Sequence, residues 1–112
     1  MLNLRIMTCA LILIGSINSQ ANAQQLEAVQ IYSDNLLLEL IRENKHLSQV
    51  VLDECQLVQD IQARAIKSEI PSYQYLWGDM LAFGVCVKKD IELGLHYMKL
   101  SADQGLPEGL EQ

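Results

Sequence analysis

The chain has 112 residues, half of them hydrophobic, and carries 14 acidic against 8 basic side chains for a formal net charge of −6. This length allows a single domain, and the hydrophobic fraction is too high for an intrinsically disordered chain. Because an acidic chain without a Lys/Arg cluster lacks the positive surface that attracts phosphates, the composition disfavours nucleic acid and anionic lipid as partners.

Residues 1–23 have the three parts of a secretory signal peptide. Arg5 supplies the basic start, residues 6–14 form an apolar stretch, and Ala21-Asn22-Ala23 provides small residues where a signal peptidase cleaves. The apolar stretch has nine residues, well short of the ~20 that a membrane-spanning helix needs. We therefore expect cleavage after Ala23, export to a bacterial periplasm, and no membrane span in the mature chain.

The helical period recurs four times after this segment, and no strand-like alternation persists beyond a few residues. The first predicted helix is capped by Ser33 or Asp34 and ends near Asn44, which gives segment 24–52 one helix. The other three predicted helices run from about Asp53 to Ser68, from Pro71 to Gly84, and from Asp90 to Gly105. The sequence thus predicts an all-α fold.

The last predicted helix carries apolar residues on two sides, as helices in stacked pairs do. Sliding the chain by 36 residues also places Ile70-Pro71 on Leu106-Pro107, which is a period typical of helical solenoids. Segment 71–105 is then one complete helix-turn-helix repeat, flanked by partial repeats within region 53–112. We predict an α-solenoid.

Within this repeat the residues resemble the Sel1-like repeat, a relative of the tetratricopeptide repeat. The resemblance rests on residues 75–85, Asp90, Tyr97 and 102–105. Small residues let antiparallel helices approach closely. The predicted helix-packing residues are Gly78, Gly94, Ala102 and Gly105.

A narrower resemblance covers nearly all of the chain after the signal peptide. Its matching fragments, the most specific of which surround the two remaining cysteines, are residues 29–32, 44–47, 55–61, 77–82, 84–87 and 104–107. These fragments are similar to the N-terminal part of the MotX family, exported Sel1-repeat components of sodium-driven polar flagellar motors. Chains of that family continue for several more repeats, so we expect either a fragment or a truncated relative.

The resemblance implies a non-enzymatic protein that binds partners through its helical repeats. Those partners would be a MotY-type ring protein around the flagellar basal body and the sodium-driven stator subunit. The alternative is another exported Sel1-repeat protein, either a cysteine-rich weak β-lactamase or a cell-wall binding protein. Members of that group carry two cysteines a few residues apart, whereas Cys55 and Cys86 are 31 apart.

Residues that could support catalysis or metal binding give weak signals. Cys55, Cys86 and His96 lack the spacing of compact zinc motifs. Asp79 and Glu92 could act as paired carboxylates, but we expect them to be solvated on an exposed helix face. Most of the four aromatic side chains that could form a binding groove are expected to belong to the core: Tyr73, Tyr75, Trp77 and Phe83. We predict no catalytic residues, no metal and no cofactor.

The two cysteines of the mature chain are predicted to form one disulfide, since export places them in an oxidising compartment. The helix containing Cys55 and the helix ending before Cys86 are joined by a tight turn, so they should pack antiparallel. The midpoint between Cys55 and Cys86 falls between Ile70 and Pro71, at that turn. Residues equally far from the turn lie side by side, which brings the two cysteines together.

Overall fold

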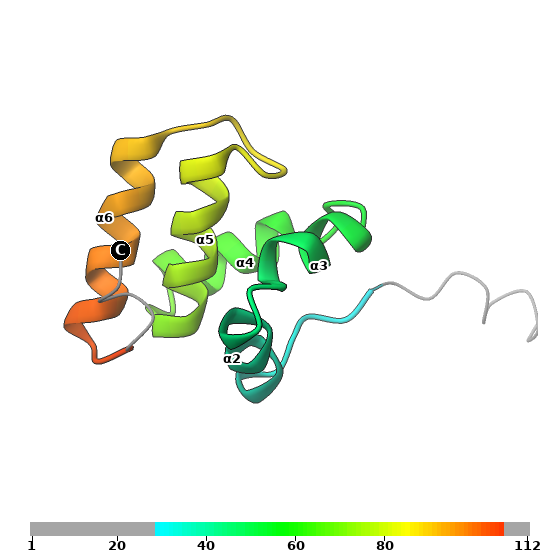
Figure 1. The fold of residues 1–112 in the computed structure, drawn as a ribbon, viewed down its shortest axis with the longest axis horizontal. Coiled ribbons are helices and arrows are strands. Elements are labelled where there is room, and N and C mark those ends of the chain that lie inside the picture. The colour runs from blue at the N-terminus through cyan, green and yellow to red at the C-terminus, as the bar shows by residue number, and fades with distance from the viewer. Residues whose placement is uncertain (1–28, 107–112) are drawn as a thin grey trace, which may run out of the picture.

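A computed structural model describes residues 29–106 (Figure 1). Its helices are α2 (Asp34–Arg42), α3 (His46–Leu52), α4 (Val58–Ile66), α5 (Pro71–Phe83) and α6 (Ile91–Asp103). This segment contains no strand, so the predicted all-α class is confirmed. Nor does any helix in it have both the length and the apolar character needed to cross a bilayer. The predicted signal peptide lies outside the described residues.

Helix α2 begins and ends close to its predicted limits. The Ser33 side chain accepts a hydrogen bond from the backbone N–H of Leu36, which satisfies one of the free donors of the first turn. The face that carries Leu37 and Ile41 is buried. Asn44 then takes a left-handed φ of 57°, a conformation that asparagine tolerates better than most residues.

Helix α3 corrects the prediction of one helix between residues 24 and 52. It has only seven residues, no side-chain cap, and two buried residues, His46 and Val50. Two buried positions on so short a helix produce no recognisable period, and a buried histidine does not look apolar in sequence. The helix was therefore missed.

The predicted second helix also begins later than expected, at Val58 instead of Asp53. Glu54 and Cys55 have φ angles of 56° and 60°, which no right-handed helix contains. The turn is held locally, because the N–H of Cys55 donates to the carbonyl of Val50 at 3.1 Å. Cys55 thus lies in a turn before α4 and not in the helix.

Helix α5 is the centre of the fold. Pro71 occupies its first turn, where a missing N–H costs nothing, and Gly84 ends it with a φ of 70°. Every residue of segment 72–81 is buried, the polar ones included. Figure 1 shows why, since α6 covers one side of α5 while α2, α3 and α4 cover the others.

Helices α4, α5 and α6 follow one another in antiparallel order. The Gln74 side-chain amide lies 3.5 Å from the Ala65 carbonyl, and Cys55 meets Cys86 at the other end of the α4–α5 pair. In the α5–α6 pair, Gly78 faces Met98 and Ala82 faces Gly94.

Helix α6 is buried on one side only. Asp90 caps it by accepting a hydrogen bond from the N–H of Leu93, and its buried residues are Gly94, Met98 and Ser101. Its exposed apolar residues are Ile91, Leu93 and Leu95. The predicted packing on two sides is therefore not found among the described residues, which contain no helix that covers the second side.

Candidate functional site

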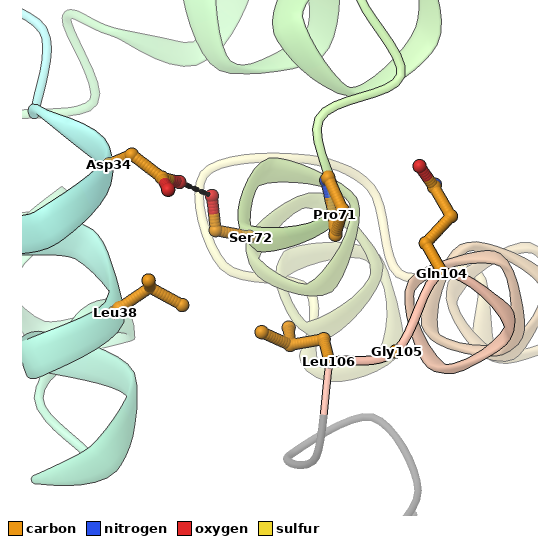
Figure 2. A pocket seen from close by; sticks show the side chains of 7 residues that line it. All are labelled: Asp34, Leu38, Pro71, Ser72, Gln104, Gly105 and Leu106. Atoms are coloured by element: carbon orange, nitrogen blue, oxygen red, sulfur yellow. Dashed lines mark hydrogen bonds between the residues drawn. The ribbon is translucent and has the colours of Figure 1, made fainter.

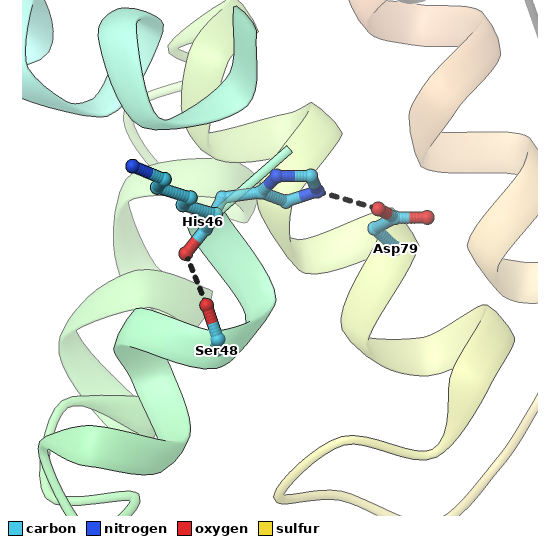
Figure 3. Close-up of polar contacts among 4 residues, drawn as sticks. His46, Ser48 and Asp79 are labelled. Atoms are coloured by element: carbon cyan, nitrogen blue, oxygen red, sulfur yellow. Dashed lines mark hydrogen bonds and ion pairs between the residues drawn. The ribbon is translucent and has the colours of Figure 1, made fainter. Parts of the chain in front are cut away.

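A buried ionisable pair lies at the contact between α3 and α5. The Nε2 atom of His46 is 2.6 Å from Oδ2 of Asp79, and the two residues are 2% and 4% exposed. Figure 3 shows the imidazole reaching from α3 to the carboxylate on α5. The His46 ring also lies 5.5 Å from the Tyr75 ring, centroid to centroid. The pair connects two elements separated by 33 positions in the sequence.

Within the described residues, three buried polar atoms have no hydrogen-bond partner. Two belong to this pair, Nδ1 of His46 and Oδ1 of Asp79, and the third is Nε1 of Trp77. Since Nε2 faces a carboxylate, the network assigns a proton to Nε2. Both side chains are too little exposed for a substrate to reach them, so the pair has a structural role and holds α3 against α5. Removal of one partner from an ionisable pair buried this deeply is costly.

This pair overturns the expectation that Asp79 is a solvated surface carboxylate. Asp79 faces inward because all sides of α5 are covered, whereas Glu92 in the first turn of α6 is exposed. The two carboxylates do not form a catalytic pair, since Asp79 is buried against His46 whereas Glu92 faces solvent. No sequence signal marks the partnership, because it depends on the position of α3.

The two cysteines predicted to pair are joined by a disulfide, with their Cα atoms 5.6 Å apart. The bond connects the turn before α4 to the α5–α6 connection. It therefore lies at the end of the antiparallel α4–α5 pair that is opposite the turn between these two helices. Its sulfurs are therefore not available to the zinc set considered with His96, which is exposed and contacts the Tyr97 ring. In the segment described, no three His, Cys, Asp or Glu side chains are grouped as a metal site requires.

Two glycines set the distance between α5 and α6. A Cβ atom added to Gly78 would lie 2.6 Å from the carbonyl oxygen of Gly94, and one added to Gly94 would lie 2.5 Å from that of Gly78. The other two predicted packing residues are placed differently. Ala102 is half-buried, whereas a Cβ atom added to Gly105, which has a φ of 95°, would meet no neighbour within 4 Å in the part of the chain that the structure describes. Gly105 thus ends the helix and does not pack it.

Of the four aromatic residues considered for a groove, Tyr73, Tyr75 and Trp77 are buried in the core. The Tyr73 hydroxyl donates to the Tyr32 carbonyl at 2.6 Å, and the Tyr32 hydroxyl donates to Asp53 at 2.5 Å. Burial raises the pKa of both tyrosines, and the hydrogen bond to Asp53 raises the pKa of Tyr32 further. Phe83, in contrast, is 66% exposed.

A small cavity of about 160 Å³ lies where α2, the start of α5 and the end of α6 meet. Figure 2 shows the residues that line it: Asp34, Leu38, Pro71, Ser72, Gln104, Gly105 and Leu106. The Ser72 hydroxyl donates to Asp34 across it. Its volume is below the roughly 300–1,000 Å³ of small-molecule sites. We regard it as a packing gap between three elements.

Exposed apolar side chains are the feature that fits protein binding best. They occur on several elements: Leu36, Val51, Leu52, Ile66, Phe83, Ile91, Leu93 and Leu95. Single exposed apolar residues are normal on a folded protein. On α6, however, Ile91 and Leu95 are about one helical turn apart and share a face, whereas Leu93 lies on a different face.

Comparison with known proteins gives a clear relative. The chain is 50% identical over 103 residues to the sodium-type polar flagellar protein MotX of Vibrio parahaemolyticus serotype O3:K6 (strain RIMD 2210633). The match covers 91% of this chain and 49% of the relative, so the chain spans about half the length of the protein it matches. The resemblance to MotX predicted from the sequence is confirmed.

No protein-family model and no solved structure matches the chain. The resemblance to the Sel1-like repeat therefore rests on the residues quoted from the sequence.

Proposed function

We propose that this chain acts in a sodium-driven polar flagellar motor, as a non-catalytic periplasmic protein that binds other motor proteins. The observation that carries the proposal is the 50% identity to MotX over 91% of the chain. The proposed partners are a MotY-type ring protein and the stator subunit, which the resemblance implies.

The arrangement of helices supports a binding role. Helices α4, α5 and α6 run antiparallel in succession, which suits a solenoid of Sel1-like repeats in which α5 and α6 form one repeat. Stacked helix pairs build extended binding surfaces. The face of α6 that carries Ile91 and Leu95 is exposed to solvent, where a further helix or a partner can pack.

Two features support a periplasmic location. Residues 1–23 carry the pattern of a secretory signal peptide. The Cys55–Cys86 disulfide suits an oxidising compartment. A non-catalytic role is supported by the buried position of the His46–Asp79 pair, which keeps it from any substrate.

Deletion of the gene tests this function. The mutant bacterium should still assemble its polar flagellum, seen by electron microscopy, but the flagellum should not rotate. Expression of the full chain together with any sequence that follows it in the gene should restore swimming, whereas a version lacking residues 2–23 should not, because it remains in the cytoplasm. A deletion strain that swims at normal speed on polar flagella would remove the assignment.

A further inference from the structure

We propose that the chain starts a further helix at Pro107, and that this helix packs on α6 with Leu110 against Ala102. Its residues, 107–112, lie outside the described part of the chain. The surface that it covers is one face of α6, which we call the α6 stripe: Ile91, Leu95 and Ala102. The inference does not rest on the proposed function. It decides between the two occupants, a further helix or a partner, that this exposed face can take.

The turn after α6 repeats a hydrogen bond of the turn after α4. After α4, the N–H of Ile70 donates to the carbonyl of Arg64 at 3.1 Å. After α6, the N–H of Leu106 donates to the carbonyl of Ser101 at 3.2 Å. Each acceptor lies two residues before the last residue of its helix. The backbone therefore leaves the two helices by corresponding paths.

The residues on either side of the donor in each turn correspond as well. Glu69 and Gly105, directly before it, both have a left-handed φ, of 52° and 95°. A proline follows it in both turns, and Pro71 is the first residue of α5. Proline suits the first turn of a helix, where a missing N–H costs nothing. Pro107 is therefore expected to begin a helix as Pro71 does.

The contact between α4 and α5 indicates where the new helix packs. Gln74 holds the fourth position of α5, and its side-chain amide lies 3.5 Å from the carbonyl of Ala65, the last residue but one of α4. Leu110 would hold the fourth position of the new helix, and Ala102 is the last residue but one of α6. Since the two turns correspond, Leu110 should meet Ala102.

A second apolar stripe on α6 faces a different neighbour. It has helical spacing and ends at the helix cap: Leu93, Tyr97, Leu100 and Gln104. The Gln104 side-chain amide donates to Gln74 at 2.5 Å, and Gln74 in turn reaches toward Ala65 on α4. This second stripe thus faces the side of α5 on which α4 lies. Residues two positions apart on a helix point about 200° apart, so the α6 stripe faces the other side.

The chain leaves α6 on the side that the α6 stripe faces. Leu106 is 8% exposed and lines the small cavity together with Leu38 of α2. Figure 2 shows the chain reaching Pro71 from above, whereas Leu106 lies below the start of α5 with its side chain toward Leu38. The residues that follow Leu106 therefore start on the side away from the connection between α4 and α5.

Packing on α6 would supply the stability that segment 107–112 lacks alone. Isolated helices shorter than about 12 residues are marginal in water. Leu110 is the one large apolar residue of the segment, while Ala102 is half-buried and Leu95 is 50% exposed. Contact between Leu110 and the α6 stripe removes apolar surface of both from water. Glu108 would lie in the first turn, where a negative charge is favoured.

Thiol cross-linking with dibromobimane, which fluoresces once it joins two thiols, tests the proposal. The protein is the exported chain, expressed with any sequence that follows residue 112 in the gene. The double variant Ala102→Cys/Leu110→Cys should cross-link within one molecule, and peptide mapping should locate the link and show the Cys55–Cys86 bond intact. The control Leu100→Cys/Leu110→Cys should give less than about a tenth of that signal, since positions 100 and 102 point about 200° apart on α6.

The melting temperature gives a second readout that needs no introduced cysteine. Leu110→Ser should lower it by about 4 °C or more, because an apolar contact with α6 is lost. Glu108→Ser, at a position that points about 200° away from Leu110, should change it by less than about 2 °C. Neither residue belongs to the core of the described segment, so both variants should fold.

The results that would overturn the inference are distinct, and each leaves the proposed function standing. Equal or absent cross-linking in the two cysteine pairs would show that Leu110 does not meet Ala102. An unchanged melting temperature of Leu110→Ser would show that this side chain makes no apolar contact. Cross-links between two molecules instead of within one would assign the α6 stripe to a second copy of the chain. Weaker binding of the MotY-type ring protein to Leu110→Ser, at an unchanged melting temperature, would assign the segment to a partner.

Discussion

The two sides of α5 are held by different kinds of contact. Toward α6 the backbones themselves meet, at Gly78 and Gly94. Toward α2 and α3 the contacts are made by polar side chains that reach between elements, namely His46 to Asp79 and Ser72 to Asp34. Ser101 and Gln104 also reach α5 by side-chain hydrogen bonds, but only the α5–α6 interface has a close approach of backbones, and only the α3 side has a buried ionisable pair.

This difference has consequences for stability. The α5–α6 pair joins neighbours in the chain, so it forms without closing a long loop. The polar contacts of α2 and α3 join α5 across 33 to 38 positions, and the disulfide closes a loop of similar length. We call the contacts of α5 with α2, α3 and α4 the α2–α4 side, and its contacts with α6 the α5–α6 side. We expect the stability of the α2–α4 side to depend more on the His46–Asp79 pair, on the disulfide and on pH. The α5–α6 side should be sensitive mainly to added side-chain volume.

The largest expected effect is loss of one member of the buried pair. Asp79→Ala or His46→Ala should lower the free energy of unfolding by about 3–5 kcal/mol, because the remaining ionisable group stays buried without its partner. Chemical denaturation measures this, with Glu92→Ala at an exposed position of α6 as the control. A loss of unfolding free energy below about 1 kcal/mol, the usual size for an exposed pair, would show that the pair does not stabilise the contact between α3 and α5.

Removal of the disulfide should have the second largest effect on stability. By the chain-entropy estimate, opening this loop costs about 3–4 kcal/mol. Cys55→Ser and Cys86→Ser should therefore lower the melting temperature by equal amounts, and dithiothreitol should lower that of the wild type in the same way. Two free thiols in non-reducing mass spectrometry of the exported protein would contradict this account.

Added volume between α5 and α6 should cost somewhat less. Gly78→Ala and Gly94→Ala should each destabilise by about 2–3 kcal/mol, since the new methyl group meets a backbone carbonyl that cannot rotate away. Gly105→Ala is the comparison, because its Cβ meets nothing and only the left-handed φ is unfavourable. We expect about 1 kcal/mol there. Equal losses at Gly78 and Gly105 would refute close packing as the cause.

The smallest effect is alkaline destabilisation on the α2–α4 side. Burial raises the pKa of Tyr32 in the folded chain, whereas an unfolded tyrosine ionises near pH 10. The folded state then holds its proton when the unfolded state has lost it, so stability is unchanged below about pH 10 and falls as pH rises above it. Tyr32→Phe should make this fall shallower in denaturation curves between pH 9 and about 11. An unchanged slope would assign the fall to other groups.

Local signals in the sequence predicted the ends of helices better than the packing between distant segments. Ser33, Pro71, Gly84 and Asp90 mark helix ends by their own backbone and side-chain preferences, and the structure places them there. The meeting of the cysteines also followed from a turn that is itself local.

The misses share a different origin. Helix α3 and the burial of Asp79 exist only because a distant segment packs on α5, and no window of neighbouring residues contains that information. The left-handed turn at Glu54 and Cys55 was missed because neither residue type favours it. Apolar residues on two sides of α6 predicted two packed faces, whereas the described residues cover one.

The central claim, that the two sides of α5 are held by different kinds of contact and respond differently to reduction, is tested most directly by native-state hydrogen exchange with and without dithiothreitol. Reduction should lower the protection of the α3 and α4 amides by an amount that matches the lost stability. The amides facing the Gly78–Gly94 contact in α5 and α6 should lose much less. Equal loss of protection across all five helices would show a single cooperative unit and contradict the account.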